Sequence, residues 1–122
     1  MRVVTLLAVL LGCLGASLSQ AADKELKVGF VYVSPVGDAG WSYSHEQGRK
    51  AIAAMPGVTT SFVEAVAEGP DSERVIQTMA RKKYDLIFAA SFGYMDSMLK
   101  VAQQFPDTVF MHCSGFKTSA NM

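Results

Sequence analysis

The 122-residue chain has few of the residues that carry redox or metal chemistry. Its only cysteines are Cys13 and Cys113, and its only histidines are His45 and His112. No CxxC pair occurs, and the histidines share no spacing that would cluster them on one helix or strand. The sequence therefore offers no redox motif and no metal-ligand set, and we expect neither a metal nor a cofactor.

Motifs that bind phosphate or activate a nucleophile are absent as well. No GxGxxG follows the first apolar strand, and there is neither a GxxxxGKS/T loop nor a GxSxG elbow. Lys plus Arg and Asp plus Glu both number 11, so no basic surplus indicates a nucleic-acid partner. These absences argue against an enzyme and leave binding as the function to consider.

Long apolar runs are also scarce, and the one at the N-terminus has the features of an export signal. Arg2 precedes the apolar run 3–11, and small residues lie at the −3 and −1 positions before Ala22. The run is about half of the ~20 residues that a membrane span needs. We therefore interpret residues 1–21 as a secretory signal peptide and expect a periplasmic or otherwise extracytoplasmic protein.

Cys13 leaves a second interpretation of this signal open. The stretch 10–13 is similar to a lipoprotein signal, in which Cys13 would carry the lipid, but Leu11 stands where a small residue is usual. We favour soluble export over lipid anchoring. In either case Cys113 has no cysteine partner within the mature chain, so no internal disulfide is expected there.

The rest of the chain alternates between apolar strands and amphipathic helices. Strands are expected at 26–33, 58–66, 85–90 and 108–113, helices at 42–55, 71–83 and 95–105, and a final loop at 115–122. The nearly uncharged first strand is typical of a parallel sheet buried on both faces. Since each crossover is long enough for a right-handed helical connection, we predict a three-layer α/β fold with a parallel sheet in the order 2-1-3-4.

Each predicted helix has a predicted cap and, from its spacing, a predicted inner face. In the first helix, Ser42 or Ser44 is expected to cap the N-terminus, with Ser44 and Gln47 at the spacing of a capping box. Asp71 or Ser72 is expected to cap the second helix. The expected inner face of the first helix consists of Gly48, Ala51, Ile52 and Met55.

Two loops lie at the predicted topological switch between the first and third strands, where such sheets bind ligands. They are residues 34–41 and 91–94, and the first holds Asp38 and the single tryptophan, Trp41. An aromatic ring beside a carboxylate suits a flat heterocycle, because the ring stacks on its face and the carboxylate accepts N–H or hydroxyl hydrogen bonds. On composition alone, an equally good interpretation is that Asp38 orders the turn and Trp41 packs under the helix.

Three stretches stand out, in order: VGDAGWSYSHEQGRKA (36–51), AEGPDSERVI (67–76) and FAASFGYMDSMLKVAQQFPDTVFMHCSG (88–115). They resemble motifs of the basic membrane protein family, the substrate-binding proteins of certain ABC importers. Asp38, Trp41, Ser42 and Gly48 match the acid, the aromatic residue, the polar residue and the helix glycine of the first motif. Ser42 replaces a frequent asparagine, and Ala67 replaces a usual proline.

The resemblance implies a type I periplasmic binding fold with two α/β lobes that close on one ligand. Residues 22–122 would be a partial N-terminal lobe without its second lobe, from an importer protein that works with an ABC permease and has no catalysis. The implied ligand is a purine base or nucleoside, with Trp41 stacking on it and Asp38 shaping or contacting the site. Phe92, Gly93 and Tyr94 would line the ligand from the loop after the third strand.

Two further residues of the resemblance have less specific implied roles. Ser42 would lie at the ligand. Because it replaces the family's frequent asparagine, a direct contact of Ser42 with the ligand does not follow from the resemblance. Asp96 would either bond the ligand or cap the third helix, and we favour the cap. Since part of the lobe is missing, we also expect marginal stability and an exposed edge at the fourth strand.

Two other classes of protein share this fold. A small exported flavodoxin-like enzyme or redox domain would need a phosphate-binding loop or a paired nucleophile and base, and the sequence shows neither. The sensor lobe of a regulator would follow a DNA-binding segment, whereas an export signal stands there. A solute-binding protein therefore remains the favoured function, with the flavodoxin-like domain as the alternative.

Overall fold

The computed structural model describes residues 24–37 and 39–122. Its elements are β1 (Leu26–Tyr32), α1 (Trp41–Ala53), β2 (Val58–Val63), α2 (Pro70–Arg81), β3 (Leu86–Ala90), the 3₁₀ turn η1 (Phe92–Tyr94), α3 (Met95–Ala102) and β4 (Val109–His112). The signal segment 1–21, Cys13 and Asp38 lie outside the described residues. Among the described residues, no helix is long and apolar enough to cross a membrane.

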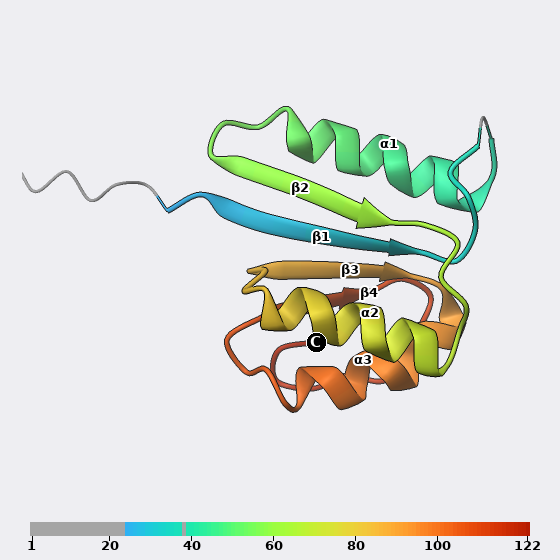
Figure 1. Ribbon diagram of the computed structural model, residues 1–122, viewed down its shortest axis with the longest axis vertical. Coiled ribbons are helices and arrows are strands. Elements are labelled where there is room, and N and C mark those ends of the chain that lie inside the picture. Colours follow the sequence, from blue (N-terminus) through green and yellow to red (C-terminus); the bar gives the residue numbers. More distant parts are fainter. Residues whose placement is uncertain (1–23, 38) are drawn as a thin grey trace, which may run out of the picture.

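The four strands form one parallel sheet in the order β2-β1-β3-β4 (Figure 1), which confirms the predicted fold class and strand order. In this register Val28 of β1 lies between Thr60 of β2 and Leu86 of β3. From β1 the chain passes through α1 to β2 on one side of β1, and it then returns through α2 to β3 on the other side and continues to β4. Because each crossover is right-handed, that reversal leaves α1 alone on one face and puts α2 and α3 together on the other.

Alternate residues of the strands build two cores of unequal size. Towards α2 and α3 the sheet contributes Val31, Ile87 and Phe110, all fully buried. Towards α1 it contributes a smaller cluster around Val28 and Phe30. Successive side chains of a strand point to opposite faces of the sheet, which is why there are two clusters. The larger cluster, on the α2/α3 face, is the main core.

Gly29 lets the main core form, because α2 lies very close to β1 at this point. A Cβ on Gly29 would lie 2.7 Å from Met79 Sδ and 3.0 Å from Tyr84 Cδ1. The glycine inside the strand therefore marks a close approach between layers, a position where no larger residue fits without a shift.

The predicted inner face of α1 was wrong except at Ile52, which is partly buried and packs against the smaller core. Met55 is 56% exposed, and Gly48 and Ala51 are also exposed. The buried residues of this helix are Ser42 and Glu46. The helix is rotated towards a polar face because Glu46 finds hydrogen-bond partners on the sheet, so burial of a charged residue replaces burial of apolar ones.

The predicted side-chain caps were wrong as well. Helices α1 and α2 begin after Gly40 and Gly69, at φ of 100° and 85°, and neither has a side-chain cap among the described residues. These φ values favour glycine. Because the helices begin one residue early, Ser44 and Ser72 fall inside them, and their hydroxyls donate back to the carbonyls of Gly40 and Gly69.

The final loop, 115–122, folds back along the outer edge of β4. The Phe110 N–H donates to the Asn121 carbonyl at 2.8 Å. The Asn121 side-chain amide lies within 2.9–3.1 Å of the carbonyls of Ala102, Phe105 and Thr108. The edge that we expected to be exposed is thus partly covered by the chain itself.

Candidate functional site

The carboxyl ends of β1 and β3 meet at the topological switch, and Trp41 joins them. Trp41 is the first residue of α1, which follows the loop after β1. Its indole Nε1–H donates to the carbonyl of Ala90, the last residue of β3, at 2.7 Å. The predicted switch between the first and third strands is confirmed by the strand order, and this hydrogen bond ties the loop 34–41 to the end of β3 across 49 residues of chain.

The indole ring of Trp41 is fixed by its hydrogen bond but remains partly exposed to solvent. The residue is 47% exposed, and the imidazole of His45 lies against it edge-on, with ring centroids 4.7 Å apart and the planes at 66°. Burial lowers the pKa of His45 below its ordinary value, so the neutral imidazole is the favoured partner of the indole at neutral pH. With the indole N–H already bonded, the π face is what Trp41 offers to a ligand.

Ser42 lies beside Trp41 but points into the protein. It is 1% exposed, and its hydroxyl oxygen accepts a hydrogen bond from the Ser34 N–H at 3.3 Å and lies 2.7 Å from the Ser34 hydroxyl. A further contact, from the Val36 N–H to Glu64 Oε2 at 2.7 Å, ties the same loop to the end of β2. In this structure Ser42 holds the loop in place, and its direct contact with a ligand stays a prediction.

The loop after β3 splits its three predicted ligand residues between surface and core. Phe92 is 57% exposed, whereas Tyr94 is fully buried and its hydroxyl donates to the Val66 carbonyl at 2.6 Å. Burial, with the charge of Glu68 as the second cause, raises the pKa of Tyr94 to about 12, so the phenol stays a neutral donor. Phe92 is therefore accessible and its contact with a ligand stays a prediction, while Tyr94 anchors the loop that carries it.

Glu68 joins the site although the sequence did not single it out. Its carboxylate Oε1 accepts a hydrogen bond from the Ser91 hydroxyl at 2.5 Å. It also occupies the space above Gly93, where any Cβ would overlap the carboxyl group. The quoted stretch 67–76 contained this residue, but only the tertiary structure shows that the loop after β2 reaches the loop after β3.

His112 also reaches the site without having been predicted there. Its Nε2 lies 2.7 Å from the Ser91 carbonyl oxygen, within hydrogen-bond distance. The dipeptide Ala90–Ser91 is therefore a meeting point of Trp41, Glu68 and His112, which come from three other segments of the chain. No motif could have indicated this, because the partners are brought together by the sheet order.

Asp96 lies apart from these residues. Its carboxylate is 75% exposed and bonds the Lys117 ammonium at 2.5 Å. The predicted cap was wrong, because α3 begins at Met95 after η1 and shows no side-chain cap hydrogen bond among the described residues. Asp96 instead lies in the first turn, where its charge suits the positive end of the helix dipole.

A buried ion pair holds α1 to the sheet. Glu46 accepts from the Arg49 Nε–H at 2.7 Å and Nη2–H at 2.5 Å, and from the Tyr32 hydroxyl at 3.1 Å. Arg49 also donates to Thr60 Oγ1 at 2.6 Å. These bonds from Arg49 hold the pKa of Glu46 below its ordinary value. Polar contacts thus fix the helix that carries Trp41.

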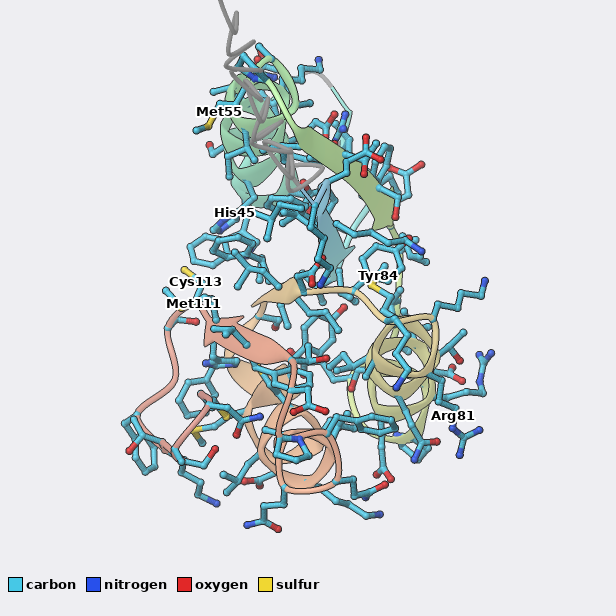
Figure 2. The ribbon with its side chains drawn as sticks, turned by 90° about the vertical axis from the view of Figure 1, so that its left-hand side faces the viewer. His45, Met55, Arg81, Tyr84, Met111 and Cys113 are labelled. Atoms are coloured by element: carbon cyan, nitrogen blue, oxygen red, sulfur yellow. The ribbon has the colours of Figure 1, made fainter. Side chains whose placement is uncertain are left out.

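A shallow cavity of about 210 Å³ lies between α1 and the ends of β3 and β4. Figure 2 shows His45 on the same side of the sheet as Met111 and Cys113, with Tyr84 and Arg81 on the opposite side. Cys113, which we expected to end the fourth strand, follows β4 and is partly buried. Within the described residues, no group of three or more His, Cys, Asp or Glu side chains could hold a metal ion.

The family model of the PnrA-like ABC transporter substrate-binding proteins matches residues 25–122, which is most of the chain. The chain belongs to this family. The expected basic membrane protein family is thereby confirmed. The fold agrees, since a solute-binding protein of an ABC transporter system from Conexibacter woesei superposes with a TM-score of 0.65 at 22% identity, over 70% of this chain and 28% of that one.

Two curated relatives of this PnrA-like chain are named for different ligands. A purine-binding protein of Brucella abortus is 52% identical over 103 residues, or 83% of this chain and 29% of that protein. A Haloferax volcanii protein named as an ABC transporter glucose-binding protein is 44% identical over 100 residues, or 81% of this chain and 25% of that protein. The chain thus spans less than a third of the length of either relative.

Proposed function

We propose that this PnrA-like chain forms one wall of the ligand site of an extracytoplasmic solute-binding protein that delivers a purine base or nucleoside to an ABC permease. The observation that carries the proposal is the exposed ring of Trp41, held by the Ala90 carbonyl at the switch between β1 and β3. Stacking of a base on such a ring contributes about 1–3 kcal/mol per base.

The hydrogen bonds in this proposal are assigned to Asp38, which precedes Trp41 in the sequence between β1 and α1. A carboxylate in this loop would accept hydrogen bonds from the ligand's N–H or hydroxyl groups, each adding on the order of 1.5–3 kcal/mol when desolvated. The Brucella relative, named for purine binding, supports the same ligand class. The rest of the protein would supply the opposite wall, as the two-lobe domain organisation of the family implies.

Calorimetry on the protein encoded by the complete reading frame tests this function. The titrants are adenine, hypoxanthine, adenosine and guanosine, with glucose added because one relative is named for it. We expect heat of binding with at least one purine and none with glucose. Binding of glucose alone, or of none of the five compounds, would overturn the purine proposal.

Substitution of Trp41 tests its stacking role. We expect Trp41→Leu to weaken purine binding by about tenfold or more, because a base loses its aromatic partner, and Trp41→Phe to retain part of the affinity. Met55→Ala is the matched control, since Met55 is a similarly exposed apolar residue near the other end of α1 (Figure 2). Equal affinities for wild type and Trp41→Leu would remove Trp41 from the site.

A further inference from the structure

Glu68 has the position and the free oxygen that a ligand-selecting acceptor needs. We propose that its carboxylate accepts an N–H hydrogen bond from the edge of the bound ligand and so selects purines that carry an amino group. The inference rests on the proposed function and deepens it. No motif assigned a role to Glu68, so the inference comes from its contacts alone.

The first observation is the place of the carboxylate. The side chain comes from the loop after β2, yet its Oε1 accepts the Ser91 hydroxyl at the carboxyl end of β3. Ser91 directly follows Ala90, which holds the indole of Trp41. The residue that Glu68 contacts is therefore the chain neighbour of the residue that positions the stacking ring.

The second observation is that Gly93 leaves room for this carboxylate. Any Cβ at Gly93 would overlap the Glu68 carboxyl group. The resemblance implied that Gly93 lines the ligand, and in the structure the space beside Gly93 is filled by Glu68. A ligand that meets the loop 91–94 at this point would therefore meet a carboxylate.

The third observation is the unused hydrogen-bonding capacity of Glu68. The residue is exposed, and within 24–37 and 39–122 its Oε2 takes part in no hydrogen bond. The bond from Ser91 fixes one oxygen and thereby orients the other. A carboxylate can only accept hydrogen bonds, so it favours a ligand N–H and disfavours a carbonyl oxygen at the same place.

Two pairs of purines make a direct test. Adenine and hypoxanthine differ at C6, and guanine and xanthine differ at C2, in each case as an amino group against a carbonyl. Calorimetry on the complete protein would give the affinity ratio within each pair for wild type, Glu68→Gln and Ser91→Ala. Glu68→Gln keeps the size and can still accept from Ser91, but it can present an N–H donor instead of the second oxygen.

We expect Glu68→Gln to move the ratio of at least one pair towards the carbonyl member by about tenfold or more. Ser91→Ala, which removes only the orienting bond, should change the same ratio much less. If Glu68 only ties the two loops together, Glu68→Gln will leave both ratios unchanged or will weaken all four purines by one common factor. Either result overturns the inference while purine binding stands.

Failure of the underlying function gives a different result. The same pairs are also compared as their nucleosides, and if wild type binds none of these bases and nucleosides, the proposed function and the inference are both wrong. Circular dichroism and thermal melting of each variant establish that it is folded before the titration. The exposed position of Glu68 and the near-identical size of glutamine favour normal folding of this variant.

Discussion

At the scale of single residues, the ion pair of Glu46 and Arg49 determines how α1 lies on the sheet. The side chains are only 4% and 15% exposed. Removing one partner of such a pair leaves an uncompensated charge in a poorly solvated place. An apolar stripe could have held the helix too, but here the charged contacts decide its rotation.

We therefore predict that Glu46→Gln destabilises the protein by roughly 3 kcal/mol, measured as a shift of the urea unfolding curve at pH 7. The control is Asp71→Asn, which breaks the ion pair with Arg74 at the same i, i+3 spacing on α2. Those side chains are 58% and 71% exposed, so its loss should cost less than about 1 kcal/mol. Equal costs for the two variants would contradict a special role of the buried pair.

The contact between Trp41 and His45 predicts a pH-dependent fluorescence signal. Burial lowers the pKa of His45, so in the folded protein protonation should have its midpoint below the ordinary value of about 6.5. The charged imidazole quenches the adjacent indole. Emission of Trp41 should therefore be constant above about pH 7 and fall as the pH drops through the lowered pKa.

The sign of the matching stability change follows from the same shift. The unfolded chain protonates His45 first, so this residue's contribution to stability is present above pH ~6.5 and is lost as the pH falls through the folded pKa. His45→Asn should remove both the fluorescence titration and this part of the stability change. An unaltered fluorescence titration in His45→Asn would show that another group causes the signal.

At the scale of elements, the contact between β1 and α2 depends on the missing side chain of Gly29. We predict that Gly29→Ala destabilises the protein by about 1–3 kcal/mol, because the new methyl group overlaps Met79 and Tyr84. Gly48→Ala is the matched control: apart from its chain neighbours and the backbone of its own helix, no described atom lies within 4 Å of its added Cβ. That control should stabilise the exposed helix by up to about 1 kcal/mol. Urea midpoints that move the same way in both variants would contradict the prediction.

The elements themselves show where prediction from sequence worked. The four strands and three helices were expected from periodicity and from Gly and Pro breaks, and all seven are found. Their ends differ by a few residues, since α1 begins at Trp41 instead of Ser42 and β2 ends at Val63 instead of Val66. Capping was mispredicted because it depends on one backbone angle at Gly40 and at Gly69, which a serine nearby does not reveal.

At the scale of the whole molecule, the sheet is covered unequally. On β4, Phe110 faces α2 and α3 and is fully buried, while Val109 and Met111 on the other face are each 48% exposed. Among the described residues, α1 is the only helix on that second face, and it packs chiefly against β2, at the far edge of the sheet from β4 (Figure 1). Residues 24–122 by themselves therefore expose apolar side chains of β4, Val109 and Met111, on the face of the sheet that bears the cavity at Cys113.

We predict that residues 24–122 produced alone bind a hydrophobic dye and self-associate, and that Val109→Thr with Met111→Gln lowers both effects. The urea midpoint of this variant should change little, because partly exposed side chains contribute little to the core. Phe110→Ala, on the same strand but the opposite face, should cost about 3–5 kcal/mol. Analytical ultracentrifugation and dye fluorescence measure these effects, and undiminished self-association of the double variant would contradict the prediction.

The sequence by itself determined the fold class, the strand order and the place of Trp41 at the switch, because periodicity, breakers and right-handed crossovers are local or nearly local properties. It also carried the three motifs that indicated the family. Only the tertiary structure decided which face of α1 is buried, which of the predicted ligand residues are exposed, and that Glu68 and His112 meet at Ser91. Those facts depend on distances between side chains far apart in the chain, and these distances arise only when the strands are set side by side in the sheet.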